Sequence, residues 1–143
     1  MAIQKSGSAK WSGGIKDGKG EISTESGALA SRPYGFNTRF EGVKGTNPEE
    51  LIGAAHAACF TMALSKMLGD AGLTATSLET KAVVTLDKVG DGFGITAIAL
   101  DLHGSVPGTD QASFSEFANN AKEGCPVSKA LAAVPISLTA TLD

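Results

Sequence analysis

Two cysteines carry most of the chemical potential of this 143-residue chain, because an ionised thiol is both a strong nucleophile and a metal ligand. Cys59 lies in a run of small residues, and Cys125 stands between a glycine and a proline. Two cysteines are too few for a disulfide scaffold. The pair therefore leaves three possibilities open, namely buried inert thiols, part of a metal site, or redox chemistry.

The sequence around Cys125 provides a source of activation for its thiol. Pro126 favours the first turn of a short helix over residues 125–131, which places Cys125 at the N-cap. The unpaired N–H groups and the positive end of the helix dipole stabilise a thiolate there. Cys59 has no comparable source, because it lies in mid-helix, about one turn past His56. Its activation must come from another part of the fold.

The helix that carries Cys59 has the clearest start signal in the chain. Asn47 is a suitable N-cap, Pro48 favours the first helical position, and Glu49 adds a negative charge beside the positive end of the dipole. We expect a helix from residue 51 to residue 68, ended by the following glycines. Residues 53–58 are almost all small, so another backbone can approach this helix closely.

The remaining segments predict a sheet covered by helices. Strand patterns form two hairpins, and the aromatic alternation of residues 34–40 predicts a further strand with Arg39 on the face opposite Phe36 and Phe40. We expect a second helix over residues 112–122 and a last strand over residues 135–142. The hairpin strands are residues 9–12, 20–25, 78–86 and 94–103. We predict a single α+β domain over residues 1–143, with helices on one face of a largely antiparallel sheet.

Composition and charge narrow the classes of function. The net charge is −3, from 12 basic and 15 acidic residues spread along the chain, so no basic patch predicts nucleic-acid binding. Polar residues such as His56 and Lys66 interrupt the apolar runs, so we expect no membrane-spanning helix. The first residues lack the apolar core of a signal peptide, which favours a cytoplasmic location.

Three segments together resemble the OsmC/Ohr family, and most closely its osmotically inducible OsmC branch. The similarity runs essentially from end to end and implies an OsmC-like fold with a central helix that bears a cysteine. It further implies an intertwined homodimer that reduces organic hydroperoxides, needs no bound cofactor and acts in oxidative or osmotic stress defence. The segments are YGFNTRF at residues 34–40, TNPEELIGAAHAACF at residues 46–60, and GCPVS at residues 124–128.

The resemblance also implies roles for individual residues. Cys59 corresponds to the peroxidatic cysteine and Cys125 to the resolving one, while Arg39 and Glu49 correspond to the residues that orient and activate Cys59. These types fit the chemistry, because a guanidinium lowers the pKa of a nearby thiol and a carboxylate holds the guanidinium in place. The implied cycle passes through a Cys59 sulfenic acid and a Cys59–Cys125 disulfide. An external dithiol, with dihydrolipoyl groups of carrier proteins as the leading candidate, then restores both thiols.

Helix geometry constrains how Glu49 could serve Cys59. Ten positions separate the two residues, which corresponds to about 15 Å along a helix axis. Two copies of the helix that cross antiparallel near Ala54 would instead bring Glu49 of one protomer towards Cys59 of the other. We therefore hypothesise that Glu49 serves the thiol of the partner protomer.

Three other functions stay open on the residues alone. Cys59 and Cys125 with His56 or His103 are suitable zinc ligands, although no close ligand pair is present. His56 could serve Cys59 as the base of a Cys-His acyl transferase, although no oxyanion-hole motif accompanies it. A non-catalytic binding or stress protein would keep both thiols in its core.

The apolar residues near these positions suggest a substrate preference. A pocket lined by them would favour bulky hydroperoxides over hydrogen peroxide, although such residues equally suit an ordinary core. The residues concerned are Phe36, Phe40, Phe60, Met62 and Leu64.

Overall fold

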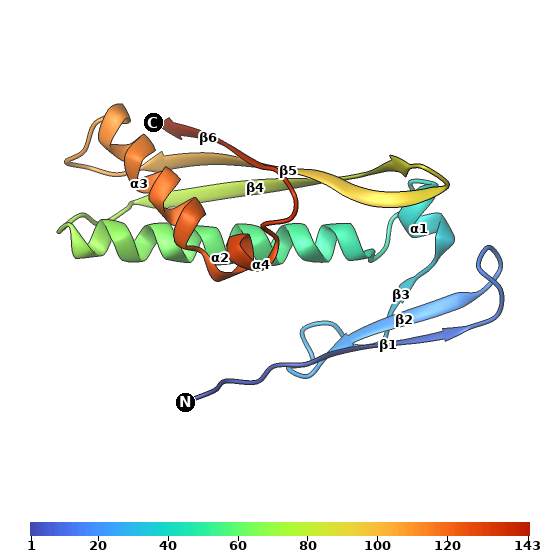
Figure 1. Cartoon of the computed structure of the whole chain (residues 1–143). Coiled ribbons are helices and arrows are strands. Elements are labelled where there is room, and N and C mark those ends of the chain that lie inside the picture. The colour runs from blue at the N-terminus through green and yellow to red at the C-terminus, as the bar shows by residue number, and fades with distance from the viewer. The chain divides into compact units, whose positions relative to one another are not determined.

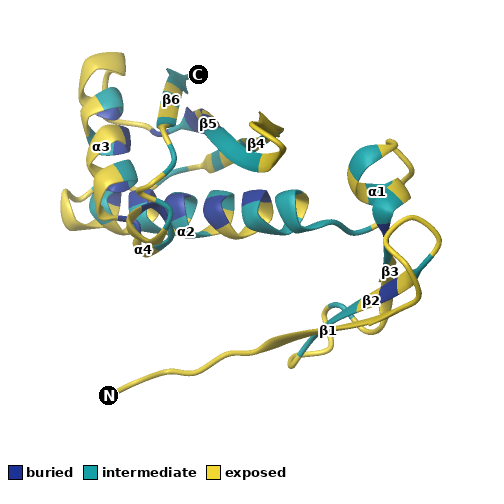
Figure 2. Cartoon of the chain, turned by 45° about the vertical axis from the view of Figure 1, so that its right-hand side comes forward, coloured by how far each residue is buried: buried dark blue, intermediate teal, exposed yellow.

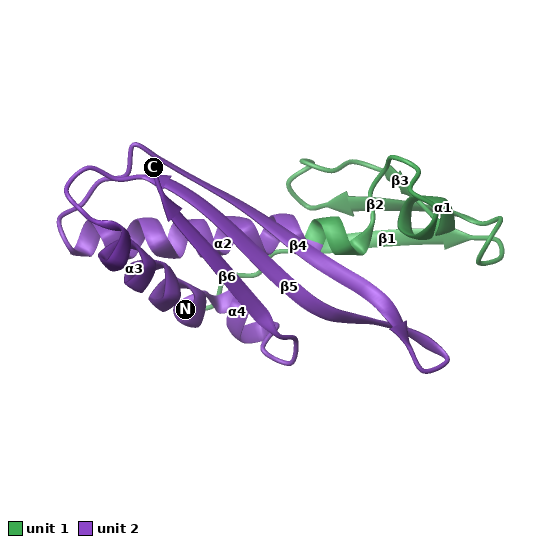
Figure 3. Ribbon diagram, turned by 90° about the horizontal axis from the view of Figure 1, so that it is seen from above, with its two compact units in different colours: residues 1–51 green, residues 52–143 purple.

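Glycine-rich turns at the start of the chain connect three short strands. In the computed structural model, which describes residues 1–143, β1 (Gly7–Ser12) pairs antiparallel with β2 (Lys19–Thr24), so the predicted hairpin is confirmed. β3 (Arg32–Tyr34) pairs antiparallel with the other edge of β2. These strands belong to the first of two compact units, which comprises residues 1–51, and residues 52–143 form the second (Figure 3).

The segment predicted as a strand over residues 34–40 is mostly helical, so that prediction is wrong. β3 ends at Tyr34, and α1 covers Phe36–Phe40. The hydroxyl of Thr38 accepts a hydrogen bond of 3.0 Å from the backbone N–H of Gly35, which helps fix the start of the helix. The rings of Phe36 and Phe40 lie 4.9 Å apart, as residues four positions apart on a helix do.

The long helix α2 (Pro48–Asp70) begins in unit 1 and continues through the first part of unit 2. Its start confirms the prediction, because the Asn47 side chain accepts a hydrogen bond of 2.8 Å from the backbone N–H of Glu50. By length and mean hydropathy, 1.4, α2 could cross a membrane. Residues along one face of α2 are nevertheless buried in unit 2, as expected for a helix of a protein core (Figure 2).

The sheet of unit 2 has the strand order β4-β5-β6. β4 (Ser77–Val89) and β5 (Gly92–Ser105) form the second predicted hairpin and pair antiparallel. β6 (Ile136–Leu142) pairs with β5 in parallel. Along β4, more buried side chains alternate with exposed ones, so one face of the sheet is covered and the other faces solvent.

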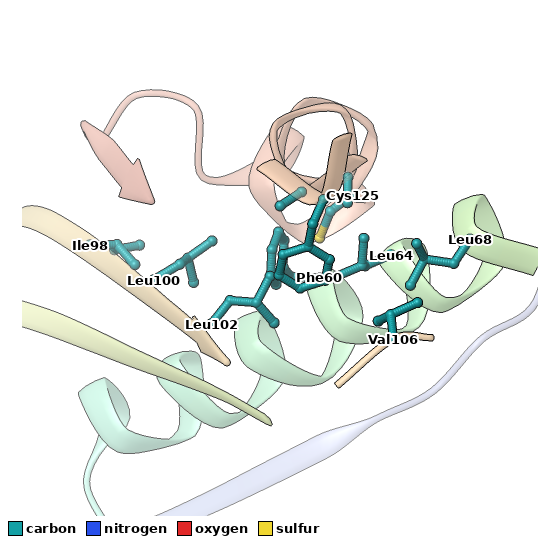
Figure 4. Close-up of a cluster of buried hydrophobic side chains, with 11 residues drawn as sticks. Phe60, Leu64, Leu68, Ile98, Leu100, Leu102, Val106 and Cys125 are labelled. Atoms are coloured by element: carbon teal, nitrogen blue, oxygen red, sulfur yellow. The ribbon is translucent and has the colours of Figure 1, made fainter. Parts of the chain in front are cut away.

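Helices α2, α3 (Gln111–Gly124) and α4 (Pro126–Ala130) supply the apolar residues that cover the sheet (Figure 1). Two glycines allow close packing: a Cβ at Gly53 of α2 would lie 3.1 Å from the carbonyl oxygen of Ala82, and one at Gly104 of β5 would lie 2.4 Å from the ring of Phe114. The core lies between these layers (Figure 4). It contains Phe60, Leu64, Leu68, Ile98, Leu100, Leu102, Val106, Phe114, Ala118, Ala121 and Cys125.

The fold is thus the predicted α+β class, with mainly antiparallel sheets and a central helix that bears Cys59. That residues 1–143 form a single domain stays a prediction. The chain divides into two compact units, and α2 runs from the first unit into the second.

Candidate active site

Cys59 lies at the margin of the buried face of α2. Residues at a spacing of about four along this helix point into unit 2, and Cys59 directly precedes one of them, Phe60. The side chain of Cys59 is therefore only half-buried, whereas Phe60 has no exposed surface. This position holds the thiol on a rigid element and leaves part of it accessible. The buried residues of the face are Gly53, His56, Phe60, Leu64 and Leu68.

Cys125 occupies the N-cap of α4, as its sequence predicts. Pro126 begins the helix, and the Cys125 sulfur accepts a hydrogen bond of 3.5 Å from the backbone N–H of Ser128. The residue is fully buried and lies beside Phe60 at the edge of the core (Figure 4). Burial alone would raise the pKa of Cys125, but hydrogen bonds from Cys59 and from the backbone at Ser128 and Val127 lower it below its usual value.

The two free thiols meet each other across α2 and α4. Cys59 and Cys125 form a side-chain hydrogen bond, and the backbone N–H of Val127 donates towards both sulfurs. The pKa of Cys59 is raised, first by burial and then by the hydrogen bond and charge of Cys125, with Val127 acting in the opposite sense. Within unit 2, each thiol therefore shifts the pKa of the other.

Arg39 and Glu49 form an ion pair within unit 1. The Nη2 of Arg39 donates to Oε1 of Glu49 at 2.8 Å, and its Nε donates to the same carboxylate at 3.1 and 3.3 Å. This two-pronged contact fixes the guanidinium plane. The side chain of Arg39 is 37% exposed and that of Glu49 12% exposed, so the pair lies at the surface of its unit with the guanidinium outermost.

From the sequence we expected these four residues to form one site. The structure shows two pairs, one of thiols and one of a guanidinium with a carboxylate. Cys59 and Cys125 belong to unit 2, whereas Arg39 and Glu49 belong to unit 1. Both arginines of the chain, Arg32 and Arg39, lie in unit 1. A guanidinium that acts on Cys59 must therefore come from unit 1 of one chain or the other.

Sequence reasoning missed one buried polar pair, which joins the two helices that carry the thiols. His56 and Ser128 are the buried polar residues of the chain, at 0% and 5% exposure, and His56 Nε2 lies 2.7 Å from Ser128 Oγ. Burial lowers the pKa of His56, which favours the neutral imidazole, and its Nδ1 has no hydrogen-bond partner. The available signal was the four-residue spacing of His56, Phe60 and Leu64, which places a histidine in an otherwise apolar buried face.

The structure also bears on the alternative functions. No group of three or more histidine, cysteine, aspartate or glutamate side chains is placed to hold a metal ion. The hydrogen bond of His56 goes to Ser128 and not to Cys59, so the structure contains no Cys59–His56 pair of the kind an acyl transferase needs.

The five residues expected to line an apolar substrate pocket lie in different surroundings, and the pocket itself stays a prediction. Phe60 and Leu64 are fully buried in the core, and Met62 is 75% exposed, because α2 turns these positions to different sides. Phe36 instead lines a cavity of about 950 Å³ within unit 1, together with Trp11, Tyr34 and several lysines. Phe40 is half-buried and contacts Phe36.

Sequence comparison relates the chain to peroxide-metabolising proteins. The family model described as OsmC-like protein matches residues 41–139. The peroxiredoxin OsmC of Escherichia coli (strain K12) is 64% identical over 133 residues, which cover 93% of each chain. The organic hydroperoxide resistance protein OhrB of Bacillus subtilis (strain 168) is 32% identical over 114 residues, which cover 78% of this chain and 80% of that protein.

Solved structures show the same fold. The crystal structure of OhrB of Bacillus subtilis superposes with a TM-score of 0.68 at 29% identity and covers 96% of this chain and 98% of that one. An organic hydroperoxide resistance protein OsmC from Legionella pneumophila gives a TM-score of 0.70 at 26% identity and covers 99% of both chains.

Proposed function

The chain belongs to the OsmC-like protein family, and we propose that it reduces organic hydroperoxides to alcohols with Cys59 as the attacking thiol and Cys125 as the resolving thiol. It is a cysteine-based peroxidase, as its similarity to a named peroxiredoxin and to organic hydroperoxide resistance proteins indicates. The observation that supports the assignment best is the hydrogen-bonded contact between two free thiols on separate helices.

Atoms and electrons are exchanged only among the two sulfurs, the peroxide and a reductant. The Cys59 thiolate attacks one peroxide oxygen, the O–O bond breaks, and the released alkoxide takes up a proton to become the alcohol. The resulting sulfenic acid is attacked by the Cys125 sulfur, so an S–S bond forms, the S–O bond breaks, and water leaves. An external dithiol then reduces the disulfide by thiol–disulfide exchange and is itself oxidised.

Accessibility supports this order of the two cysteines, and the pKa of Cys59 sets a condition on it. Cys59 is half-buried, so peroxide can reach it, whereas Cys125 is fully buried. The lowered pKa of Cys125 favours its ionised form, which suits the thiol that attacks the sulfenic acid in the second step. The raised pKa of Cys59 means that it requires a nearby cation to ionise before the first step.

We assign that cation to Arg39, held by Glu49. Glu49 lies ten residues before Cys59 on α2, about 15 Å along the helix axis, so the carboxylate cannot reach the sulfur along its own helix. A second copy that crosses α2 antiparallel near Ala54 would bring its Arg39–Glu49 pair towards Cys59. The exposed small residues Ala54 and Ala58, beside Met62 at 75% exposure, offer an apolar surface for that crossing.

The remaining partners follow from this cycle. The reductant is a dithiol, for which dihydrolipoyl groups on carrier proteins are our candidate. A cytoplasmic location suits free thiols that must be returned to the reduced state after each turnover. We assign the protein a role in oxidative or osmotic stress defence and a preference for alkyl hydroperoxides over hydrogen peroxide.

Thiol counting tests the roles of the two cysteines. One equivalent of an alkyl hydroperoxide should remove two free thiols from the wild-type protein, one from Cys125→Ser, and none from Cys59→Ser. If wild-type protein keeps both thiols, the buried-thiol alternative replaces the peroxidase. If Cys59→Ser still loses its remaining thiol at the wild-type rate, the roles of the two cysteines are reversed.

Mixed dimers test the assignment of Glu49 to the partner protomer. Cys59→Ser chains and Glu49→Ala chains are each expected to be nearly inactive alone. A heterodimer of the two contains one site with both Cys59 and the partner's Glu49, so it should recover about half of the wild-type activity. Recovery no greater than in either parent would show that Glu49 acts within its own chain.

A further inference from the structure

The two buried polar residues of the chain bond to each other, and each lies three positions from one of the cysteines. His56 lies three positions before Cys59 on α2, and Ser128 lies three positions after Cys125 at the first turn of α4. Nε2 of His56 and Oγ of Ser128 are 2.7 Å apart, with exposures of 0% and 5%. The bond therefore joins the helix that carries one cysteine to the helix that carries the other.

The first turn of α4 in turn determines where the sulfurs lie. The backbone N–H of Ser128 donates to Cys125 Sγ at 3.5 Å, and the N–H of Val127 donates towards both sulfurs. A shift of α4 would thus move Cys125 and these N–H groups together. Cys59 would stay in place, because the core holds α2 at Phe60 and Leu64.

Apart from this hydrogen bond, a histidine and a serine are unfavourable residues for a buried position. His56 occupies a buried face whose following members are Phe60, Leu64 and Leu68, and removing a polar ring from water costs free energy. An apolar residue would avoid this cost. The one contact that a histidine gains here, and an apolar residue would not, is the hydrogen bond to Ser128.

We propose that His56 and Ser128 are positioning residues for the resolving step: their hydrogen bond holds the first turn of α4 so that the Cys125 sulfur can attack the Cys59 sulfenic acid. This inference rests on the proposed peroxidase function. In the step it governs, the Cys125 sulfur forms the S–S bond, the S–O bond of Cys59 breaks, and hydroxide leaves and takes a proton as water. Neither residue exchanges a proton or electron with the substrate.

Loss of the bond should slow resolution more than the reaction with peroxide. In Ser128→Ala and His56→Leu, disulfide formation after one equivalent of alkyl hydroperoxide should slow by about tenfold, the size expected for one buried hydrogen bond. Dimedone should then trap several times more Cys59 sulfenic acid, and excess peroxide should give more sulfinic acid, both measured by mass spectrometry. The initial oxidation of Cys59 should change less than threefold.

Conservative and control variants separate positioning from general damage. Ser128→Thr keeps the hydroxyl and His56→Gln keeps a polar atom near the Nε2 position, so both should resolve close to the wild-type rate. The double variant Ser128→Ala/His56→Leu should be no slower than either single variant, because all three lack the same bond. Ser137→Ala, at an exposed position on β6, should match wild type.

Two outcomes would overturn the inference. One is unchanged trapping and unchanged disulfide formation in folded Ser128→Ala and His56→Leu. The other is an equal slowing of both steps, which a damaged fold would cause, with no rescue in Ser128→Thr and His56→Gln. Failure of the peroxidase function itself would appear differently, as an absence of Cys59 oxidation in the wild-type protein.

Discussion

The two units of the chain differ in how they hold their functional side chains. Every apolar residue of the buried core belongs to unit 2, and unit 1 buries no residue except Gly20 and Gly35. Unit 2 thus fixes its two sulfurs by packing, whereas unit 1 fixes its guanidinium by an ion pair at its surface. The two thiols therefore lie on a well-packed part of the chain, whereas the proposed activating charge lies on a part with little core of its own.

The largest contrast between the units should appear in stability. Phe60→Ala removes a fully buried ring of unit 2 and should lower the free energy of unfolding by about 3–5 kcal/mol. Ile15→Ala, at a position of unit 1 that is 68% exposed, should change it by less than about 0.5 kcal/mol. Urea denaturation measures both, and equal losses would contradict the contrast.

A smaller effect should reveal what unit 1 contributes to the chemistry. Arg39→Ala removes the proposed cation, which leaves Cys59 with a raised pKa from burial and from its contact with Cys125. The rate of Cys59 oxidation at neutral pH should fall by about a hundredfold, and the midpoint of its pH profile should move to higher pH, because more alkaline solution is needed to form the thiolate.

Variants of the same ion pair sharpen this test. Arg39→Lys keeps the charge but loses the two-pronged contact with Glu49, so its rate should lie between wild type and Arg39→Ala. Glu49→Gln should have a smaller effect than Arg39→Ala. An unchanged pH midpoint in Arg39→Ala would mean that Cys59 is activated entirely within unit 2.

The smallest effect concerns the polar contact inside the core of unit 2. Burial lowers the pKa of His56 below its usual 6.5 in the folded protein, so the unfolded chain binds a proton that the folded chain resists. The free energy of unfolding should therefore fall as the pH drops below about 6.5. His56→Gln should make this dependence of the unfolding free energy on pH less steep. Ser137→Ala, at an exposed position on β6, should keep it. A slope that persists unchanged in His56→Gln would locate its cause elsewhere.

Local signals account for most of the elements and for both cysteine positions. The Asn47-Pro48 start and the Cys125-Pro126 start each encode a cap within a few residues, so the two helices that carry the thiols are predictable. The segment after Tyr34 was not predictable in the same way, because Phe36 and Phe40 fit either a strand or a helix by their spacing. The hydrogen bond from the backbone N–H of Gly35 to the hydroxyl of Thr38 caps this segment and favours the helix.

Contacts between distant segments lie beyond such signals. The parallel pairing of β6 with β5 depends on how α3 and α4 return the chain to the sheet, which no local pattern states. His56 and Ser128 are 72 residues apart, and neither sequence neighbourhood indicates the other. The sequence motifs locate the thiols, but the hydrogen bonds that hold them in place appear only when the chain is folded.

The cap of α4 is formed by the sulfur that the proposed cycle would oxidise. A thiolate is a better acceptor for the backbone N–H of Ser128 than a disulfide sulfur is, so this short helix should be held more firmly in the reduced protein than in the oxidised one. We therefore expect α4 to be better ordered when Cys125 is reduced than when it is oxidised. In the proposed cycle, an oxidised molecule would offer a reductant a loosened segment next to the disulfide that must be cleaved.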